Sequence, residues 1–513
     1  MKSTRLLLIP LTAALLASCS SGGGGGQSSA SSATTPSTTS ETSSATGGSS
    51  QSSSYEVPDN VDAYFWSTGS QGMTTQLQTL ATEFEEAVKE NTGKTVHMHV
   101  TVEGSYKDIA DKINKGLTVG NIPNMCVAYP DTVADILAKE IPGRQYLYDL
   151  EEYINDPDIG FGTQEYLGDD AAYDEDDIVY TFLDEGRHYA REGMFSYPFM
   201  KSSEVMFYNV HDVERAYKFF KPNVLGIDNI RADLAQMDWA EFTTLLASVM
   251  EHKEDILSTL QRAAWYDSDS NWLISQLYQK EIPYTDLVDG KGVIALEEEK
   301  NLSAAATMVD GYKDLYDRGL ITTGGTENTY GSNAFVNGEV LFSIGSSGGT
   351  GYNMPDGLEP SDIGVVPVPA ANGNPSYVSQ GPTLCFLKNQ TITEAENKAQ
   401  MYYAWQFAKF LTNPANNVRL CIRGSEGYLP IRYSAYESAA YMEFLEDESI
   451  YASSAKVLIN EISGKYYNAP VFPGTATLRD GLGTAIPYVF AGEKTSRAAI
   501  SDAIDAAKKK MEA

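Results

Sequence analysis

Basic residues are scarce in this 513-residue chain. The 37 lysines and arginines stand against 69 aspartates and glutamates, which gives a formal net charge of −32. Nucleic-acid binding needs a basic surface that neutralises phosphates, so this deficit argues strongly against a nucleic-acid partner. It also argues against attachment to an anionic lipid surface by charge. Any attachment to a membrane must therefore come from another feature of the chain.

Cysteines and long apolar runs are scarce as well. After the N-terminal region only Cys126, Cys385 and Cys421 remain, an odd number, and each lies beside apolar residues. No pair has the spacing of metal ligands, and we expect three buried small side chains rather than disulfide partners. Beyond the N-terminus the sequence has no apolar run long enough to cross a bilayer. Neither a metal nor another cofactor is expected.

The N-terminus has the pattern of a signal peptide. Lys2 and Arg5 precede an apolar run, Leu6–Ala17, which is too short to span a bilayer permanently. The run ends in Leu16-Ala17-Ser18-Cys19, which resembles a bacterial lipobox. That resemblance implies cleavage before Cys19 and lipidation of its sulfur. The alternative is an ordinary secretory signal with a chance cysteine. We expect residues 1–18 to be the signal peptide and 19–54 to be the lipidated cysteine and a Ser/Gly-rich linker.

From residue 55 the composition becomes that of a globular protein, with alternating strand and helix patterns. Strands are predicted at 62–66, 96–102 and 124–129, and helices at 70–92, 106–115 and 132–138. This order indicates a parallel sheet covered by helices. Ligands of such sheets bind at the carboxyl ends of the strands. Three short segments follow those ends: Ser67–Gly69, Gly104–Tyr106 and Tyr129–Asp131.

Four segments, in order, resemble the family 1 extracellular solute-binding proteins of bacterial ABC importers. They are Phe195–Asn209, Phe335–Ser347, Gly364–Pro369 and Gly427–Arg432. The resemblance implies an α/β, type II-like periplasmic-binding-protein fold whose two lobes, each a mostly parallel sheet flanked by helices, close about a hinge on a ligand. We expect residues 55–175 plus about 360–410 in lobe 1, and about 176–359 plus 411–513 in lobe 2.

Several residues are candidates for the ligand site. Trp66 and Trp272 lie near predicted loop ends, and the chain has 32 tyrosines, which fits stacking on sugars although most aromatic rings pack in cores. Compared with the glycerol-3-phosphate-binding branch of the family, the resemblance places Tyr106, Ser202 and Arg479 at ligand positions. Gly381 falls near the glycine turn of that branch and is also taken as a ligand candidate, and Ser347 is a looser match. Arg479 falls where that branch binds phosphate; alternatively it pairs with a surface acid. The acidic ligand residue of that branch falls at Pro130, which has no side-chain acceptor.

The segment Gly345–Gly349 has the G-x-S-x-G pattern of a hydrolase nucleophile, with Ser347 at its centre. In that fold the histidine base follows the serine, and here all five histidines precede it. We therefore expect Ser346 and Ser347 in a loop facing the ligand, with a solvated turn as the equal alternative, and treat a serine hydrolase as the weaker one. His97 and His99 share a strand face, and without a third ligand we expect an exposed strand rather than a metal site.

The sequence thus predicts a lipid-anchored, monomeric, non-enzymatic receptor on the extracellular or periplasmic face of the cell membrane. It captures a small carbohydrate by closing two lobes and passes it to the membrane subunits of an ABC permease. Glycerol 3-phosphate or a glycerophosphodiester is the alternative ligand. A sensor or adhesin built on the same fold is a further alternative.

Overall fold

The computed structural model describes residues 56–168, 175–424 and 427–512. The signal peptide, Cys19 and the linker lie outside these ranges. Residues Ser54–Ala513 form one compact unit, which contains two five-stranded sheets, each with its own apolar core. Within the described residues, no helix is both long and apolar enough to span a membrane.

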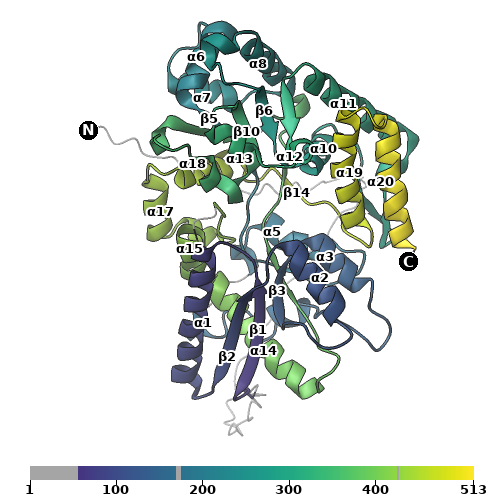
Figure 1. Cartoon of the computed structure of the whole chain (residues 1–513). Coiled ribbons are helices and arrows are strands. Elements are labelled where there is room, and N and C mark those ends of the chain that lie inside the picture. The colour runs from purple at the N-terminus through teal and green to yellow at the C-terminus, as the bar shows by residue number, and fades with distance from the viewer. Residues whose placement is uncertain (1–55, 169–174, 425–426, 513) are drawn as a thin grey trace, which may run out of the picture. The chain divides into compact units, whose positions relative to one another are not determined.

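The first sheet has the strand order β2-β1-β3-β13-β4. Helices α1, α2 and α14 pack against it (Figure 1). The elements that precede the second sheet along the chain are β1 (Val61–Ser67), α1 (Gln71–Thr92), β2 (Val96–Val102), α2 (Tyr106–Gly116), β3 (Met125–Ala128), α3 (Pro130–Leu137), α4 (Glu151–Ile154), α5 (Tyr180–Asp184) and β4 (Tyr197–Pro198).

The sequence pattern explains the first of these helices. Ser70 accepts a hydrogen bond from the Met73 amide at its N-cap, and Gly93 ends it with φ 70°. Its apolar residues recur every three or four positions and are all buried: Met73, Leu77, Leu80, Ala81, Phe84 and Val88. The predicted cap and apolar face are confirmed, and they fix α1 against the sheet whose strand ends carry part of the site.

The second sheet has the order β11-β5-β10-β6-β9. It is built from β5 (Glu204–Asn209), β6 (Arg262–Tyr266), β9 (Ile321–Thr323), β10 (Val340–Ser346) and β11 (Ile363–Pro367). Its helices are α6 (Val210–Phe220), α7 (Ile227–Ala235), α8 (Trp239–Glu251), α9 (Lys253–Ile256), α10 (Asp269–Gln279), α11 (Glu299–Asp317), α12 (Gly324–Glu327) and α13 (Gly331–Val336).

The rest of the chain returns to both cores. It comprises β12 (Tyr377–Val378), β13 (Thr383–Phe386), α14 (Glu394–Thr412), α15 (Pro414–Arg423), α16 (Tyr433–Tyr436), α17 (Ala439–Glu446), α18 (Ile450–Val457), β14 (Tyr466–Tyr467), α19 (Thr475–Phe490) and α20 (Ser496–Met511), while β7 (Asp286–Val288) and β8 (Lys291–Val293) form a small hairpin. Figure 1 shows α19 and α20 beside each other.

Both sheets are mixed, which corrects the expectation of mostly parallel sheets. In the first, β1 pairs in parallel with β2 and β3, but β13 runs antiparallel to β3 and β4. In the second, β10 and β9 are parallel to β6, whereas β5 is antiparallel to β10 and β11. The antiparallel partner β13 enters its sheet from a distant part of the chain, and local periodicity does not reveal its direction.

The chain passes between the two cores later than the predicted lobe boundaries. Met200 packs in the first core and Val205 in the second, and the return falls between Tyr377 and Leu384. The two crossing segments are joined by a β-bridge between Ser202 and Gln380. A further β-bridge joins Lys201 to Leu429. The two crossing segments, residues 200–205 and 377–384, therefore lie side by side and, as shown below, contribute residues to the site.

Candidate ligand-binding site

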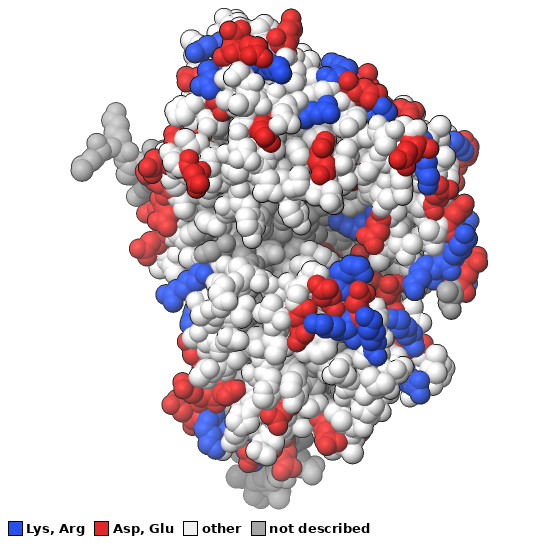
Figure 2. Space-filling view, in the orientation of Figure 1, with Lys and Arg blue, Asp and Glu red and all other residues white. Residues whose placement is uncertain are grey.

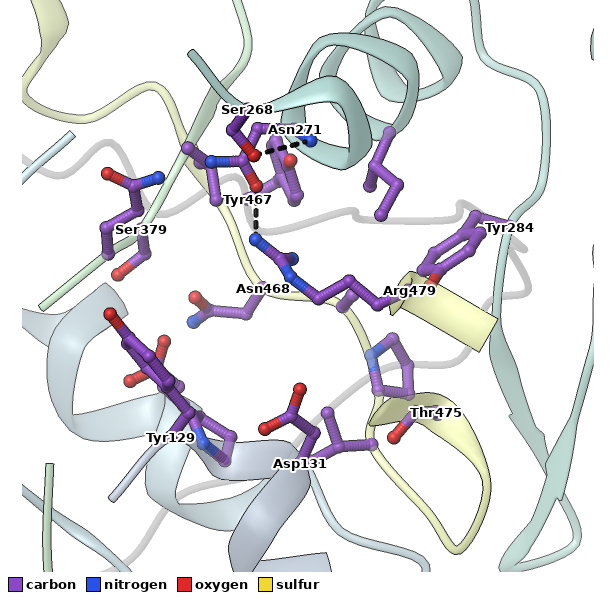
Figure 3. A pocket seen from close by; sticks show the side chains of 18 residues that line it. Tyr129, Asp131, Ser268, Asn271, Tyr284, Ser379, Tyr467, Asn468, Thr475 and Arg479 are labelled. Atoms are coloured by element: carbon purple, nitrogen blue, oxygen red, sulfur yellow. Dashed lines mark hydrogen bonds between the residues drawn. The ribbon is translucent and has the colours of Figure 1, made fainter. Parts of the chain in front are cut away.

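A cavity of about 300 Å³ lies where both cores and the crossing segments meet. This volume is at the lower end of the range for small-molecule sites, about 300–1,000 Å³. Figure 3 shows its wall. The residues that line it and bear on its chemistry are Tyr129, Asp131, Glu185, Ser268, Asn271, Tyr284, Ser379, Gln380, Tyr467, Asn468 and Arg479.

Two parts of the wall come from the carboxyl ends of strands. Of the three predicted segments, Tyr129–Asp131 lines the cavity, whereas Ser67–Gly69 and Gly104–Tyr106 do not. Tyr129 caps α3 and Asp131 lies in its first turn, directly after β3. On the other sheet, Ser268 caps α10 just after β6 and accepts a hydrogen bond from the Asn271 amide at 3.2 Å. The crossing segment after β12 supplies Gln380, and the segment after β14 supplies Asn468. Strand ends from both sheets thus face one cavity.

The cavity carries one guanidinium and one carboxylate that are not directly paired. An N–H of Arg479 donates to the side-chain oxygen of Asn271. Figure 3 shows the guanidinium turned toward Asn271 and the Asp131 carboxylate on another side of the cavity. Burial raises the pKa of Asp131, and the charge of Arg479 partly opposes that rise. A ligand in this cavity therefore meets a hydrogen-bond donor group and an acceptor group together.

A second carboxylate at the wall, Glu185, is already neutralised. Glu185 is 8% exposed and forms an ion pair with Lys201, which is fully buried. The Lys201 ammonium also lies 5.9 Å from the ring centre of Phe182. Within the described wall, the charges therefore balance: Glu185 against Lys201, and Asp131 against Arg479.

Three tyrosines give the cavity its apolar surface. Tyr284 is 5% exposed, and Tyr467 stacks on Tyr278 with ring centres 4.0 Å apart. Tyr129 is 40% exposed, and its ring lies 4.4 Å from that of Tyr106. Aromatic faces of this kind bind the C–H faces of flat polar molecules while neighbouring side chains bind the edges.

Three of the lining residues carry a polar atom without a hydrogen-bond partner among the described residues. These atoms are Ser379 Oγ, Gln380 Oε1 and Asn468 Oδ1, and all three are buried. The Asn468 amide is oriented because its nitrogen donates to the Thr181 carbonyl at 2.6 Å. Buried polar atoms without partners are costly, and a cavity wall is where a ligand can supply those partners.

The structure brings two of the eight predicted ligand residues to this cavity or next to its wall. Arg479 lines it, and Tyr106 packs against Tyr129. Gly381 follows Gln380 at φ +103°, where a Cβ would lie 2.4 Å from the Met200 carbonyl, so it permits the two crossing segments to approach closely. Trp66 is partly buried against the first core and does not line the cavity.

The other predicted residues lie elsewhere. Trp272 is 1% exposed, with Tyr312 and Tyr266 stacked against its ring at 3.9 and 5.5 Å, so both aromatic contacts are internal. Ser202 is 2% exposed in a crossing segment, and Ser346 lies 3.4 Å from it. Ser347 is fully buried in a 3₁₀ segment rather than an exposed loop, and its hydroxyl has no partner in the described chain.

The structure also shows the surroundings of the three cysteines and of the histidine pair on β2. Cys126 and Cys385 face each other on β3 and β13 with sulfurs 3.2 Å apart, and with Cys421 they are buried and free, as expected. His99 Nε2 lies 2.7 Å from Asp62 Oδ1 and its ring stacks on Tyr64, while His97 is exposed on the same strand face.

The comparisons with known proteins decide the family. The profile of the bacterial extracellular solute-binding protein family matches residues 79–445, most of the chain. The chain belongs to this family. A comparison with curated proteins finds no match.

Solved structures share the fold. The GacH receptor of Streptomyces glaucescens, determined unliganded and with acarbose, has a TM-score of 0.61 and 19% identity, over 88% of this chain and 98% of that one. UgpB of Mycobacterium tuberculosis, in complex with glycerophosphocholine, has a TM-score of 0.61 and 14% identity, over 89% and 99%. The substrate-binding protein Lmo0181 of Listeria monocytogenes, in complex with cycloalternan, has a TM-score of 0.62 and 12% identity, over 88% and 100%.

Most of the site was not predicted. The resemblance put the acidic ligand position at Pro130, and the structure shows that its neighbour, Asp131, lines the cavity. The signal was present, because Tyr129–Asp131 follows a predicted strand. Gln380, Tyr467 and Asn468 come from segments around the crossings, which carry no motif of their own.

Proposed function

We propose that this protein is the substrate-binding component of an ABC importer and that it binds a neutral mono- or disaccharide in the cavity around Arg479. The supporting observation is the composition of one wall: tyrosine rings, oppositely charged Asp131 and Arg479, and buried Ser379, Gln380 and Asn468 atoms that find no hydrogen-bond partner in the part of the chain that the structure describes. Sugar hydroxyls both donate and accept, so one ligand serves all of these groups. Binding then favours the closed arrangement of the two lobes.

The charge of the molecule supports a neutral ligand. The net charge of −32 gives no long-range attraction for anions. On the face shown in Figure 2, acidic and basic side chains alternate around the periphery, while uncharged residues cover much of the middle. A phosphorylated ligand would meet Arg479 but also the carboxylate of Asp131.

The anchoring and delivery steps belong to the same proposal. A lipid on Cys19 would hold a monomeric receptor at the outer face of the cell membrane, and the Ser/Gly-rich linker would let it reach its permease. Two or more acyl chains are needed for stable anchoring. We infer that the chain binds its ligand without chemical turnover. The buried position of Ser347 supports this, because a nucleophile needs access to its substrate.

A melting screen tests the proposed function. Glucose, maltose, cellobiose, glycerol 3-phosphate and glycerophosphocholine would each be added to the protein from Tyr55 onward. A ligand at about 100 times its Kd stabilises the folded state by about 2.7 kcal/mol, so at least one saccharide is expected to raise Tm measurably. The phosphate compounds are expected to give smaller shifts. If no saccharide raised Tm, the carbohydrate proposal would be overturned.

Arg479 is the specific observation that favours a phosphate-bearing ligand as the second candidate, and Asp131→Asn separates the two. For a neutral saccharide, the substitution removes a charged acceptor, and affinity is expected to fall about tenfold. For glycerol 3-phosphate, an anion, it removes a repulsive charge, and affinity would rise. Calorimetric titration of both variants with both ligand classes measures the sign of each change. Asp111→Asn, on the exposed face of α2, is the matched control and should change neither.

A further inference from the structure

Arg479 and Asp131 have opposite charges, line one cavity, and yet form no direct ion pair among the described residues. A flexible arginine in a largely buried site would be expected to bind the nearest carboxylate. If Arg479 formed an ion pair with Asp131, neither side chain would be available to a ligand, and the cavity would lose its two charged ligand contacts. Something must therefore hold Arg479 in its observed position.

The structure shows a chain of hydrogen bonds behind Arg479 that ends at a buried carboxylate. Arg479 donates to the Asn271 oxygen, and the Asn271 nitrogen donates to Glu204 Oε1 at 2.9 Å. The hydroxyl of Tyr266 donates to the other Glu204 oxygen. Glu204 is 3% exposed and Asn271 is 1% exposed. Because Glu204 only accepts when ionised, it fixes the Asn271 amide with its oxygen toward Arg479.

We propose that Glu204, acting through Asn271, is the positioning residue that holds Arg479 away from Asp131 and keeps the cavity open to a ligand. Glu204 does not line the ligand cavity itself. It lies on β5, Asn271 lies in the first turn of α10 after β6, and Arg479 lies on α19, so three elements of one core set the orientation of the arginine. The role of this positioning in saccharide affinity rests on the proposed function, whereas the orientation of Arg479 does not.

The positioning carries a pH dependence. Burial raises the pKa of Glu204 from 4.5 to about 7, while hydrogen bonds from Tyr266 and Asn271 and the charge of Arg479 oppose that rise, and Asp267 adds to it. Protonation below about pH 7 replaces a charged acceptor by a neutral one, which is a weaker partner for Asn271. The hydrogen-bonded link from Glu204 through Asn271 therefore restrains Arg479 most strongly above pH 7.

Glu204→Gln tests this, because glutamine keeps the shape but, like the protonated acid, has no charge and only one oxygen that is purely an acceptor. Whichever of glucose, maltose and cellobiose binds most tightly would be titrated into both proteins from pH 5.5 to 8.5. At pH 8 the variant is expected to bind about tenfold more weakly, and near pH 5.5 the two affinities should converge. A reduction that is equal at every pH would indicate a merely structural role and overturn the proposal.

Thermal stability gives a readout that needs no ligand. Because folding raises the pKa of Glu204, the folded wild type keeps a proton between about pH 4.5 and 7 that the unfolded chain has lost, so this group's contribution to stability fades as pH rises through that window. The variant lacks this contribution, and its Tm relative to wild type is expected to increase with pH. Weaker binding together with equal or higher Tm at pH 8 separates positioning from structural damage; a Tm difference that does not increase with pH would contradict the assignment.

The unliganded structure of the variant completes the test. We expect the Arg479 guanidinium to leave Asn271 and pair with Asp131, and an arginine still bonded to Asn271 would refute the proposal even if no saccharide binds the wild type. Glu299→Gln is the matched control, since it makes the same substitution at an exposed ion pair with Arg497 and leaves Glu204, Asn271 and Tyr266 unchanged. This control should retain the Arg479 position and bind saccharide within about twofold of wild type.

Discussion

Arg479→Ala is expected to weaken saccharide binding by about 100- to 1,000-fold. The guanidinium has five N–H donors, and one of them is used by Asn271, which leaves others to face the cavity. Two charge-assisted hydrogen bonds to a ligand contribute about 3–4 kcal/mol together, which corresponds to this loss of affinity. Calorimetric titration with the saccharide that gives the largest melting shift measures the change in Kd.

Arg497→Ala is the control for that experiment. Arg497 lies on α20, which packs against α19, and pairs with Glu299 on the surface, so its loss removes a neighbouring arginine without touching the cavity. Its Kd should equal that of the wild type. If Arg479→Ala bound the saccharide as tightly as this control, the cavity around Arg479 would not be the binding site.

Lys201→Met is expected to lower the free energy of unfolding by about 3–5 kcal/mol, because it leaves Glu185 charged and unpaired. Both partners are shielded from water, with side-chain exposures of 1% and 11%. Lys201 also lies in the segment that crosses between the two cores, where it forms an isolated β-bridge with Leu429. Denaturant unfolding measures the loss.

The double variant Lys201→Met/Glu185→Leu is expected to recover most of that stability, since an apolar pair of similar size has no buried charge to compensate. The exposed pair Lys107–Asp111 on α2 gives the matched control, and Lys107→Met should be close to wild type. A double variant as unstable as Lys201→Met alone would show that the two residues are not coupled. Because Glu185 lines the cavity, the same variants test whether its neutralisation matters for binding.

Local sequence patterns predicted the parts of the fold that depend on local physics. The α1 cap at Ser70, its stop at Gly93 and its buried face follow from spacing alone. The direction of β13 and the points at which the chain changes core do not, because they depend on contacts between residues far apart in sequence. The predicted boundaries near 175 and 360 accordingly precede the crossings observed at Met200–Val205 and Tyr377–Leu384.

The site divides in the same way. Arg479 was found through resemblance, and Tyr129–Asp131 through its position after a strand. The resemblance placed the acidic ligand position at Pro130, which has no acceptor, so Asp131 itself was not singled out. Trp272 was a candidate because tryptophans often stack on sugars. In the structure its ring is stacked on Tyr312 and Tyr266 in the core and is not available to a ligand. The pairing of Glu185 with Lys201 and the link from Glu204 to Arg479 involve residues whose partners only the folded chain brings together.

The central claim is that a neutral saccharide binds in the cavity shared by Asp131 and Arg479. The most direct test is a crystal structure of the protein with the saccharide that stabilises it best. We predict sugar oxygens within about 2.7–3.2 Å of Arg479 and Asp131, with Gln380 and Asn468 as further partners and a tyrosine ring against the sugar. A saccharide bound elsewhere, or one that leaves Arg479 and Asp131 without contacts, would contradict the account.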